Sequence, residues 1–276
     1  MRKKAHEIRW RQGHVLTKEA VDKIGLPTQD SRDDIFVVVS HDCDIVQAPE
    51  IEPYIELQLG HRVDTSNGNY THAKNPRKLH LPYSVSNSEA VIEMVAVDKV
   101  NVPKETLGAF EPDRSFSLPS DKLSTLQRWL AARYRRTAFP DAFNERLVST
   151  GIKERLSRIL APLGEDIHAV FFQVDGGEQV ERKEPEDTYS LEIYLLYDTG
   201  SDPEKAKNIV EEASKRIIKM FKKRLRNDKG RWHFIELVDC APISDEAMTF
   251  RQSILLKRWD LDYVSLRDPS QGEPVE

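Results

Sequence analysis

The stretch FVVVSHDCDIV, residues 36–46, joins an apolar run to a group of side chains that ionise, bind metals or form hydrogen bonds. The run Ile35–Val39 is too short for a helix and is rich in β-branched residues, so it predicts a buried strand. Functional side chains are often placed where a strand ends, because the strand holds them rigidly. Ser40–Asp44 is therefore the first candidate site in this sequence.

The first hundred residues predict a small, mostly β unit around this strand. Tyr54–Leu59 alternates apolar and polar residues with period two, as a half-buried strand does, and Gly60 is expected to end it. Leu79–Leu81 and Val91–Val97 are further strand candidates. Residues 61–78 predict a long polar connection with turn-forming residues at its centre.

The rest of the chain predicts a helical middle and a second mixed unit. Residues 101–118 are expected to form a linker, after which apolar residues at three- and four-residue spacing predict a helix over 121–136. Two shorter helices are expected near 141–149 and 152–161. The last third predicts strands, a long helix opened by Pro203, another strand and a last helix: His168–Val174, Leu191–Tyr197, 203–225, Trp232–Val238 and Asp245–Trp259.

Together these segments predict an α+β fold with three parts. The mostly β N-terminal unit is expected over residues 1–100, the linker and helical middle over 101–165, and a β-β-α-β-α sandwich-like unit over 166–276. No segment is as apolar as a membrane span requires, and no apolar stretch follows the basic N-terminus, so neither a membrane protein nor a signal peptide is expected. With only two cysteines, a reduced cytoplasmic setting is the simplest expectation.

The 276-residue chain has a net charge of −5 and a pI of about 6.0, which does not favour nucleic-acid binding by bulk charge. Two regions nevertheless concentrate positive charge. Residues 128–158 contain eight Lys and Arg against three Asp and Glu, and residues 201–231 contain eleven against five. Two basic surfaces on an acidic protein are therefore expected.

The Ser40–Asp44 stretch admits a structural interpretation and three functional ones. In the structural interpretation Cys43 is a small buried residue and the aspartates shape a turn through hydrogen bonds to the backbone. In the first catalytic interpretation Cys43 is a nucleophile with His41 or a remote histidine as base. The flanking aspartates would raise the pKa of the thiol, which counts against this interpretation.

A divalent metal is the basis of the other two interpretations. On a continuing strand Asp42 and Asp44 would share a face, so with Glu56 they could hold Mg²⁺ or Mn²⁺. His41 would then be the nearby acid or base. In the last interpretation Cys43 and His41 bind zinc with His72 or His80, although their spacing is tighter than that of structural zinc pairs and no second cysteine is near.

The basic segments and the loop histidines give further candidates. Arg128, Arg133, Arg135, Arg136 and Arg146, with aromatic residues among them, predict a surface for nucleic-acid phosphates and bases; an amphipathic helix with buried aromatics and solvated arginines is the alternative. Lys215–Arg231 predicts a second basic surface, or a helix end that suits the helix dipole. A cleft beside Ser40–Asp44 is expected to be lined by His61, His72, His80, Lys74 and Arg77.

Through four short motifs, this sequence resembles a set of uncharacterised bacterial proteins associated with mobile elements or phage defence. The motifs are Trp10-x-x-Gly13, Ser40-x-Asp42-Cys43-Asp44, Asn75-Pro76-Arg77 and Arg128-Trp129-Leu130. The resemblance implies a setting and no activity. We therefore expect a bacterial cytoplasmic protein that binds or acts on nucleic acid, with metal-dependent phosphodiester hydrolysis as its chemistry if it is an enzyme. The alternatives are a non-catalytic partner-binding subunit and, last, a thiol-dependent hydrolase.

Overall fold

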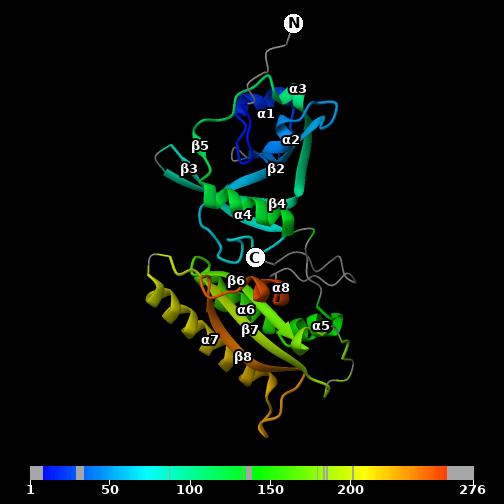
Figure 1. The fold of residues 1–276 in the computed structure, drawn as a ribbon, viewed down its shortest axis with the longest axis vertical. Coiled ribbons are helices and arrows are strands. Elements are labelled where there is room, and N and C mark those ends of the chain that lie inside the picture. Colours follow the sequence, from blue (N-terminus) through cyan, green and yellow to red (C-terminus); the bar gives the residue numbers. More distant parts are fainter. Residues whose placement is uncertain are drawn as a thin grey trace. The chain divides into compact units, whose positions relative to one another are not determined.

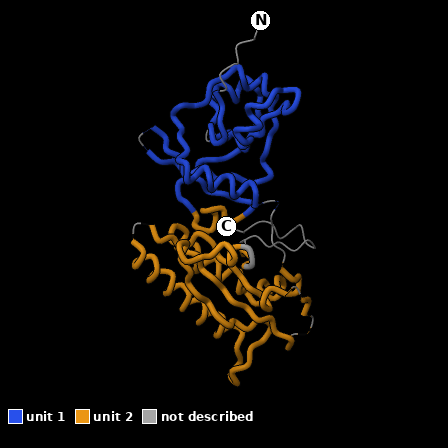
Figure 2. The backbone as a smooth tube through the Cα atoms, viewed as in Figure 1, with its two compact units in different colours: residues 1–66, 76–134 blue, residues 67–75, 135–276 orange. Residues whose placement is uncertain are grey.

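The structure, a computed structural model, describes residues 9–28, 34–86, 88–132, 134, 139–178, 180–182, 184, 186–200 and 202–259. It confirms the expected α+β class. The chain forms two compact units (Figure 2). Unit 1 takes residues 1–66 and 76–134, and unit 2 takes residues 67–75 and 135–276.

Unit 1 is built on a five-stranded antiparallel sheet in the order β1-β2-β4-β3-β5 (Figure 1). Its strands are β1 (Asp34–Val38), β2 (Tyr54–Val63), β3 (Lys78–Val85), β4 (Ser88–Pro103) and β5 (Phe116–Ser117). Two isolated antiparallel bridges extend this sheet: Val15 pairs with Val37 of β1, and Leu16 pairs with Pro112, just before β5. The sheet of unit 1 therefore nearly closes on itself.

Four helices pack around this sheet. They are α1 (Lys18–Ile24), α2 (Asp42–Val46), α3 (Lys104–Leu107) and α4 (Ser120–Ala132). Thr17 caps α1 by accepting the Ala20 N–H, as N-cap threonines commonly do. Alternate residues of β1 and β2, such as Phe36 and Leu57, are fully buried in the core.

Two expectations for unit 1 need correction. Gly60 does not end β2, which continues to Val63. A Cβ on Gly60 would lie 2.6 Å from Cγ2 of Ile92, so the glycine allows β2 and β4 to approach closely within the sheet. Residues 101–118 are more than a linker, because they include the end of β4, α3 and β5.

Unit 2 has a four-stranded sheet in the order β8-β7-β6-β9, with helices on one face (Figure 1). Strands β7 and β8 run parallel and the other pairs are antiparallel. Its elements are α5 (Asp141–Ser149), α6 (Ile152–Leu160), β6 (Ile167–Val174), β7 (Tyr189–Tyr197), α7 (Pro203–Leu225), β8 (Ile235–Ser244), α8 (Phe250–Leu255) and β9 (Lys257–Arg258), with short 3-10 turns at Ala161–Leu163 and Asp175–Gly177.

The core of unit 2 lies between the sheet and helices α5, α6 and α7. Phe172 of β6 and Phe221 of α7 are fully buried there. The alternate residues Ala169 and Phe171 point to the other face of the sheet, where they pack against Leu256. The expected helix over 203–225 is confirmed, with Asp202 accepting the Lys205 N–H at its N-cap.

The end of unit 2 differs from the prediction. The helix expected over Asp245–Trp259 is limited to α8, which begins after a capping box formed by Thr249 and Gln252. Trp259 instead enters the core and stacks on Phe172, with ring centroids 4.8 Å apart. Along the described ranges, no helix is long and apolar enough to cross a membrane.

Candidate functional site

The Ser40–Asp44 stretch turns into a short helix as soon as β1 ends. Asp42–Val46 form α2, and the Nδ1 atom of the N-cap residue His41 accepts the Cys43 N–H at 3.2 Å. The expectation of a continuing strand is therefore wrong. Helical residues two apart do not share a face, so the geometric reason for pairing Asp42 with Asp44 is lost.

The carboxylate of Asp42 links α2 to the segment before α1. Its Oδ1 accepts the Gln12 N–H at 2.8 Å, and its Oδ2 accepts from Nη1 of Arg11 at 3.2 Å. Gln12 is buried, and its side chain donates to the Val39 carbonyl at 2.8 Å. Asp42 therefore holds two distant chain segments together. The structural interpretation expected a hydrogen bond to the backbone, but within a local turn.

Of the two other predicted metal ligands, only Glu56 has an ion-pair partner among the described residues. Asp44 is exposed, and Oε2 of Glu56 lies 3.3 Å from Nζ of Lys99. Among the residues that the structure describes, no three His, Cys, Asp or Glu side chains gather closely enough to hold a metal ion. The predicted Mg²⁺ or Mn²⁺ site is thus a proposal without geometric support, and so is the zinc alternative.

The predicted thiol site offers an accessible sulfur. Cys43 is exposed on α2, whereas Cys240 is buried in unit 2. His41, two residues before Cys43, already accepts the Cys43 N–H through its Nδ1 atom. Cys43 is accordingly not buried, contrary to the structural interpretation.

The loop histidines form separate groups. His61 lies 2.8 Å from Asp34, and His80 is buried with its Nε2 2.8 Å from Glu93. Both belong to unit 1, whereas His72 and Lys74 belong to unit 2.

Residues 67–75, named the strap below, leave β2 of unit 1, pack into unit 2 and return to β3 (Figure 2). Nδ2 of Asn69 donates to the Ser157 hydroxyl at 2.8 Å. The Thr71 hydroxyl and the Lys74 ammonium both donate to the Gly164 carbonyl, at 3.1 and 2.8 Å. These polar contacts fasten the strap to α6 and to the turn that precedes β6.

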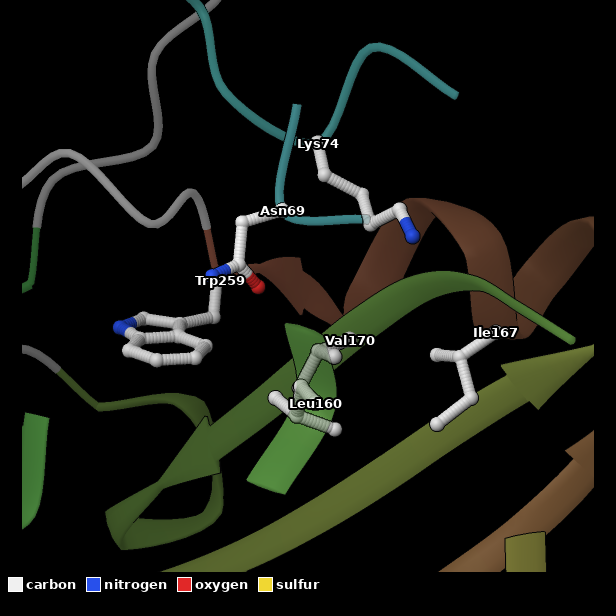
Figure 3. Close-up of a pocket in the computed structure, with 6 residues that line it drawn as sticks. All are labelled: Asn69, Lys74, Leu160, Ile167, Val170 and Trp259. Atoms are coloured by element: carbon white, nitrogen blue, oxygen red, sulfur yellow. The ribbon is translucent and has the colours of Figure 1, made fainter. Parts of the chain in front are cut away.

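Lys74 of the strap and His168 of β6 both have strongly lowered pKa values. Burial lowers the pKa of Lys74 to about 7. The ring of His168 stacks on His72 at 4.2 Å, and burial together with that neighbour lowers its pKa to about 4. A small pocket beside Lys74 is lined by Asn69, Leu160, Ile167, Val170 and Trp259 (Figure 3).

This cluster was only partly visible in the sequence. His72 and Lys74 were candidates, but His168 lies almost a hundred residues later and was expected only as part of a strand. The pocket encloses about 10 Å³, which is room for about one water molecule. This pocket therefore leaves no space for a substrate.

The first predicted basic surface is largely structural where it is described. Arg128 is exposed and donates to Thr125 of its own helix at 3.1 Å, while Arg133, Arg135 and Arg136 lie outside the described residues. The expectation that Arg146 binds phosphate is wrong: it is 7% exposed and donates to four backbone carbonyls, those of Arg182, Glu184, Asp187 and Phe234.

The aromatic residues of that region are also mostly core residues. Trp129 is 1% exposed and Phe139 is 4% exposed, so neither ring is available for stacking on a base. Tyr134 differs, with 81% of its surface exposed. For Trp129 the alternative interpretation is therefore correct: α4 is an amphipathic helix that buries this ring.

The second predicted basic segment begins on α7, which covers one face of the sheet of unit 2 (Figure 1). The buried residues Ala213, Ile217 and Phe221 face the sheet. Several exposed cations lie on α7, and five of them that share one face of its second half are named the basic stripe: Lys215, Arg216, Lys219, Lys222 and Lys223. Lys215 pairs with Glu212 at 2.6 Å, and the other four form no ion pair with any residue the structure describes.

Comparison with protein-family models, curated proteins and solved structures gave no match to this chain. The choice between the candidate sites therefore rests on geometry and charge. The Ser40–Asp44 stretch and the strap use their polar groups mainly inside their own units, whereas the basic stripe leaves its charges in solvent.

Proposed function

We propose that this protein binds nucleic acid through the basic stripe of α7, which contacts the phosphate backbone. The observation that carries the proposal is the set of five exposed cations on one helix face. Between residues 213 and 231 Asp228 is the only acid, so the local charge is strongly positive although the whole chain is at −5. Closely spaced cations of this kind bind polyanions by displacing their counterions.

The helix dipole does not account for the basic stripe. The dipole favours cations within the last turn of a helix, which here begins near Lys222. Lys215, Arg216 and Lys219 lie upstream of that turn. The pairs Lys215–Lys219 and Lys219–Lys223 place like charges four residues apart, which costs about 0.2–0.5 kcal/mol each. A phosphate ligand offsets this repulsion.

The setting in bacterial defence or mobile elements rests on the short motifs alone and belongs to this proposal. The stripe carries no aromatic side chain, so it supports backbone binding and gives no means to read bases. Phosphodiester hydrolysis would need a further catalytic group. A binding function is therefore what the geometry supports best.

The test is the salt dependence of binding to a fluorescein-labelled DNA duplex, measured by anisotropy. Five phosphate contacts give a slope of log K against log salt of about −4.5. In Lys219→Gln/Lys222→Gln the slope should weaken by about 2. The matched control, Lys205→Gln/Lys207→Gln, removes the same charge from the other half of α7 and should keep the wild-type slope. Equal slopes for both variants would refute the proposal.

A further inference from the structure

The connection between α2 and β2 exposes three apolar side chains on unit 1. Val46 is 51% exposed, Ile51 is 68% exposed and Tyr54 is 55% exposed. Single exposed apolar residues are normal on protein surfaces, but a group of them within one short segment often marks an interaction site.

Lys104 of α3 holds both ends of this connection. Its backbone N–H donates to the Pro53 carbonyl at 3.0 Å. Its ammonium donates to the carbonyls of Asp44 at 2.5 Å and Gln47 at 2.9 Å. Because one residue contacts the chain beside Val46 and beside Tyr54, both ends of the connection are hydrogen-bonded to α3, which lies next to it (Figure 1).

Exposed carboxylates without an ion pair occur in the same segment and on the neighbouring helix. Glu50 and Glu52 lie on the connection, Asp44 lies on α2, and Glu105 lies on α3 beside Lys104. All four are exposed, and none forms an ion pair within the described part of the chain. Glu56, by contrast, is paired with Lys99. The three apolar residues and these four acids are called the acidic-rimmed patch below.

We propose that the acidic-rimmed patch binds a basic amphipathic helix of another protein. Its apolar centre needs an apolar face to cover it, and its carboxylates need Lys or Arg at the edge of that face. A helix with leucine-like residues on one side and basic residues beside them supplies both. Nucleic acid is disfavoured here because the carboxylates repel phosphates, so the patch is separate from the basic stripe and does not depend on it.

The probe is a synthetic leucine–lysine peptide whose leucines share one helical face, labelled for fluorescence anisotropy. The full-length wild type should bind it, and Ile51→Ser/Tyr54→Ser should bind about tenfold more weakly or worse. Glu50→Gln/Glu52→Gln should also lose affinity and show a shallower salt dependence. Because all four side chains are exposed, the melting temperatures of both variants should stay near that of the wild type.

Two controls separate the patch from general stickiness. Val97→Ser removes an apolar side chain that is 71% exposed elsewhere on unit 1, and it should bind the peptide as the wild type does. A peptide of the same composition with its leucines scattered should bind at least about tenfold more weakly.

Three outcomes would overturn the proposal. One is equal binding by the wild type and Ile51→Ser/Tyr54→Ser; another is equal binding of the amphipathic and scattered peptides. The third is self-association of the wild type that Ile51→Ser/Tyr54→Ser abolishes, measured by size-exclusion chromatography with light scattering, because the occupant would then be a second copy of this chain.

Discussion

Replacing Lys74 by methionine should stabilise this protein at neutral pH. The side chain is 6% exposed, and burial lowers the pKa of Lys74 from 10.5 to about 7. At pH 7 the unfolded chain holds this proton fully and the folded chain only half the time. Keeping Lys74 in the fold therefore costs about 4 kcal/mol at pH 7, from the shift at about 1.4 kcal/mol per pKa unit.

Methionine removes that cost and keeps most of the packing of the lysine stem. The lost hydrogen bond to Gly164 is worth about 1 kcal/mol. The Gly164 carbonyl still accepts from Thr71 at 3.1 Å, so it is not left without a donor. The net gain expected for Lys74→Met at pH 7 is about 3 kcal/mol.

The pH dependence identifies the cause. Because the pKa of Lys74 is lowered on folding, the unfolded state binds more protons between pH 7 and 10.5, and the stability of the wild type rises with pH in that window. From pH 7 to pH 9 the advantage of Lys74→Met should shrink by about 2 kcal/mol.

Urea unfolding at pH 7 and pH 9, followed by tryptophan fluorescence, measures both quantities. Lys222→Met, at an exposed position on α7, is the matched control and should show no such change with pH. The reasoning is refuted if Lys74→Met is less stable than the wild type at pH 7, or if its difference from the wild type is the same at both pH values. Either result would mean that burial of the amine does not lower the unfolding free energy.

Three further results are expected. Asp42→Ala should lower the unfolding free energy by about 1–2 kcal/mol, because it leaves the Gln12 N–H without its acceptor; urea unfolding measures this, and an unchanged value would contradict the structural role of the carboxylate. Ellman's reagent should react with one thiol per native chain and with two after denaturation, since Cys43 is exposed and burial raises the pKa of Cys240 to about 12. Mg²⁺ and Mn²⁺ should leave the melting temperature of the wild type unchanged; a rise that Asp44→Ala abolishes would restore the metal-site hypothesis.

Local sequence pattern was sufficient for much of unit 2. The apolar spacing along α7 and the alternation along β7 each repeat often enough to identify the element and its buried face. The α+β class followed from the order of these elements. The same pattern also placed the second basic surface, because a buried stripe on a helix fixes which residues remain exposed.

Long-range contacts explain what the sequence could not provide. Asp42 and Asp44 follow a strand, yet they lie on a helix that the neighbouring residue His41 caps, and the carboxylate of Asp42 accepts a hydrogen bond from Gln12, thirty residues earlier. The run of β-branched residues gives no sign of the contact with Gln12. The sequence predicts Arg146 as a surface cation, whereas in the structure it donates to backbone carbonyls of the loop after β6. The Asp42 carboxylate and the Arg146 guanidinium therefore resemble functional groups in the sequence, because their hydrogen-bond partners lie far along the chain.

The charge pattern shows why the net value alone misleads. Lysines and arginines at residues 215–231 number nine against the single acid Asp228, whereas residues 42–56 contain five acids and no Lys or Arg. At physiological salt a ligand senses charges within about 8 Å, so each surface acts by its local charge and not by the total of −5. The two proposals therefore make opposite demands on their ligands. A polyanion should bind the basic stripe and not the acidic-rimmed patch, and a basic helix should do the reverse, so each pair of variants serves as the control for the other.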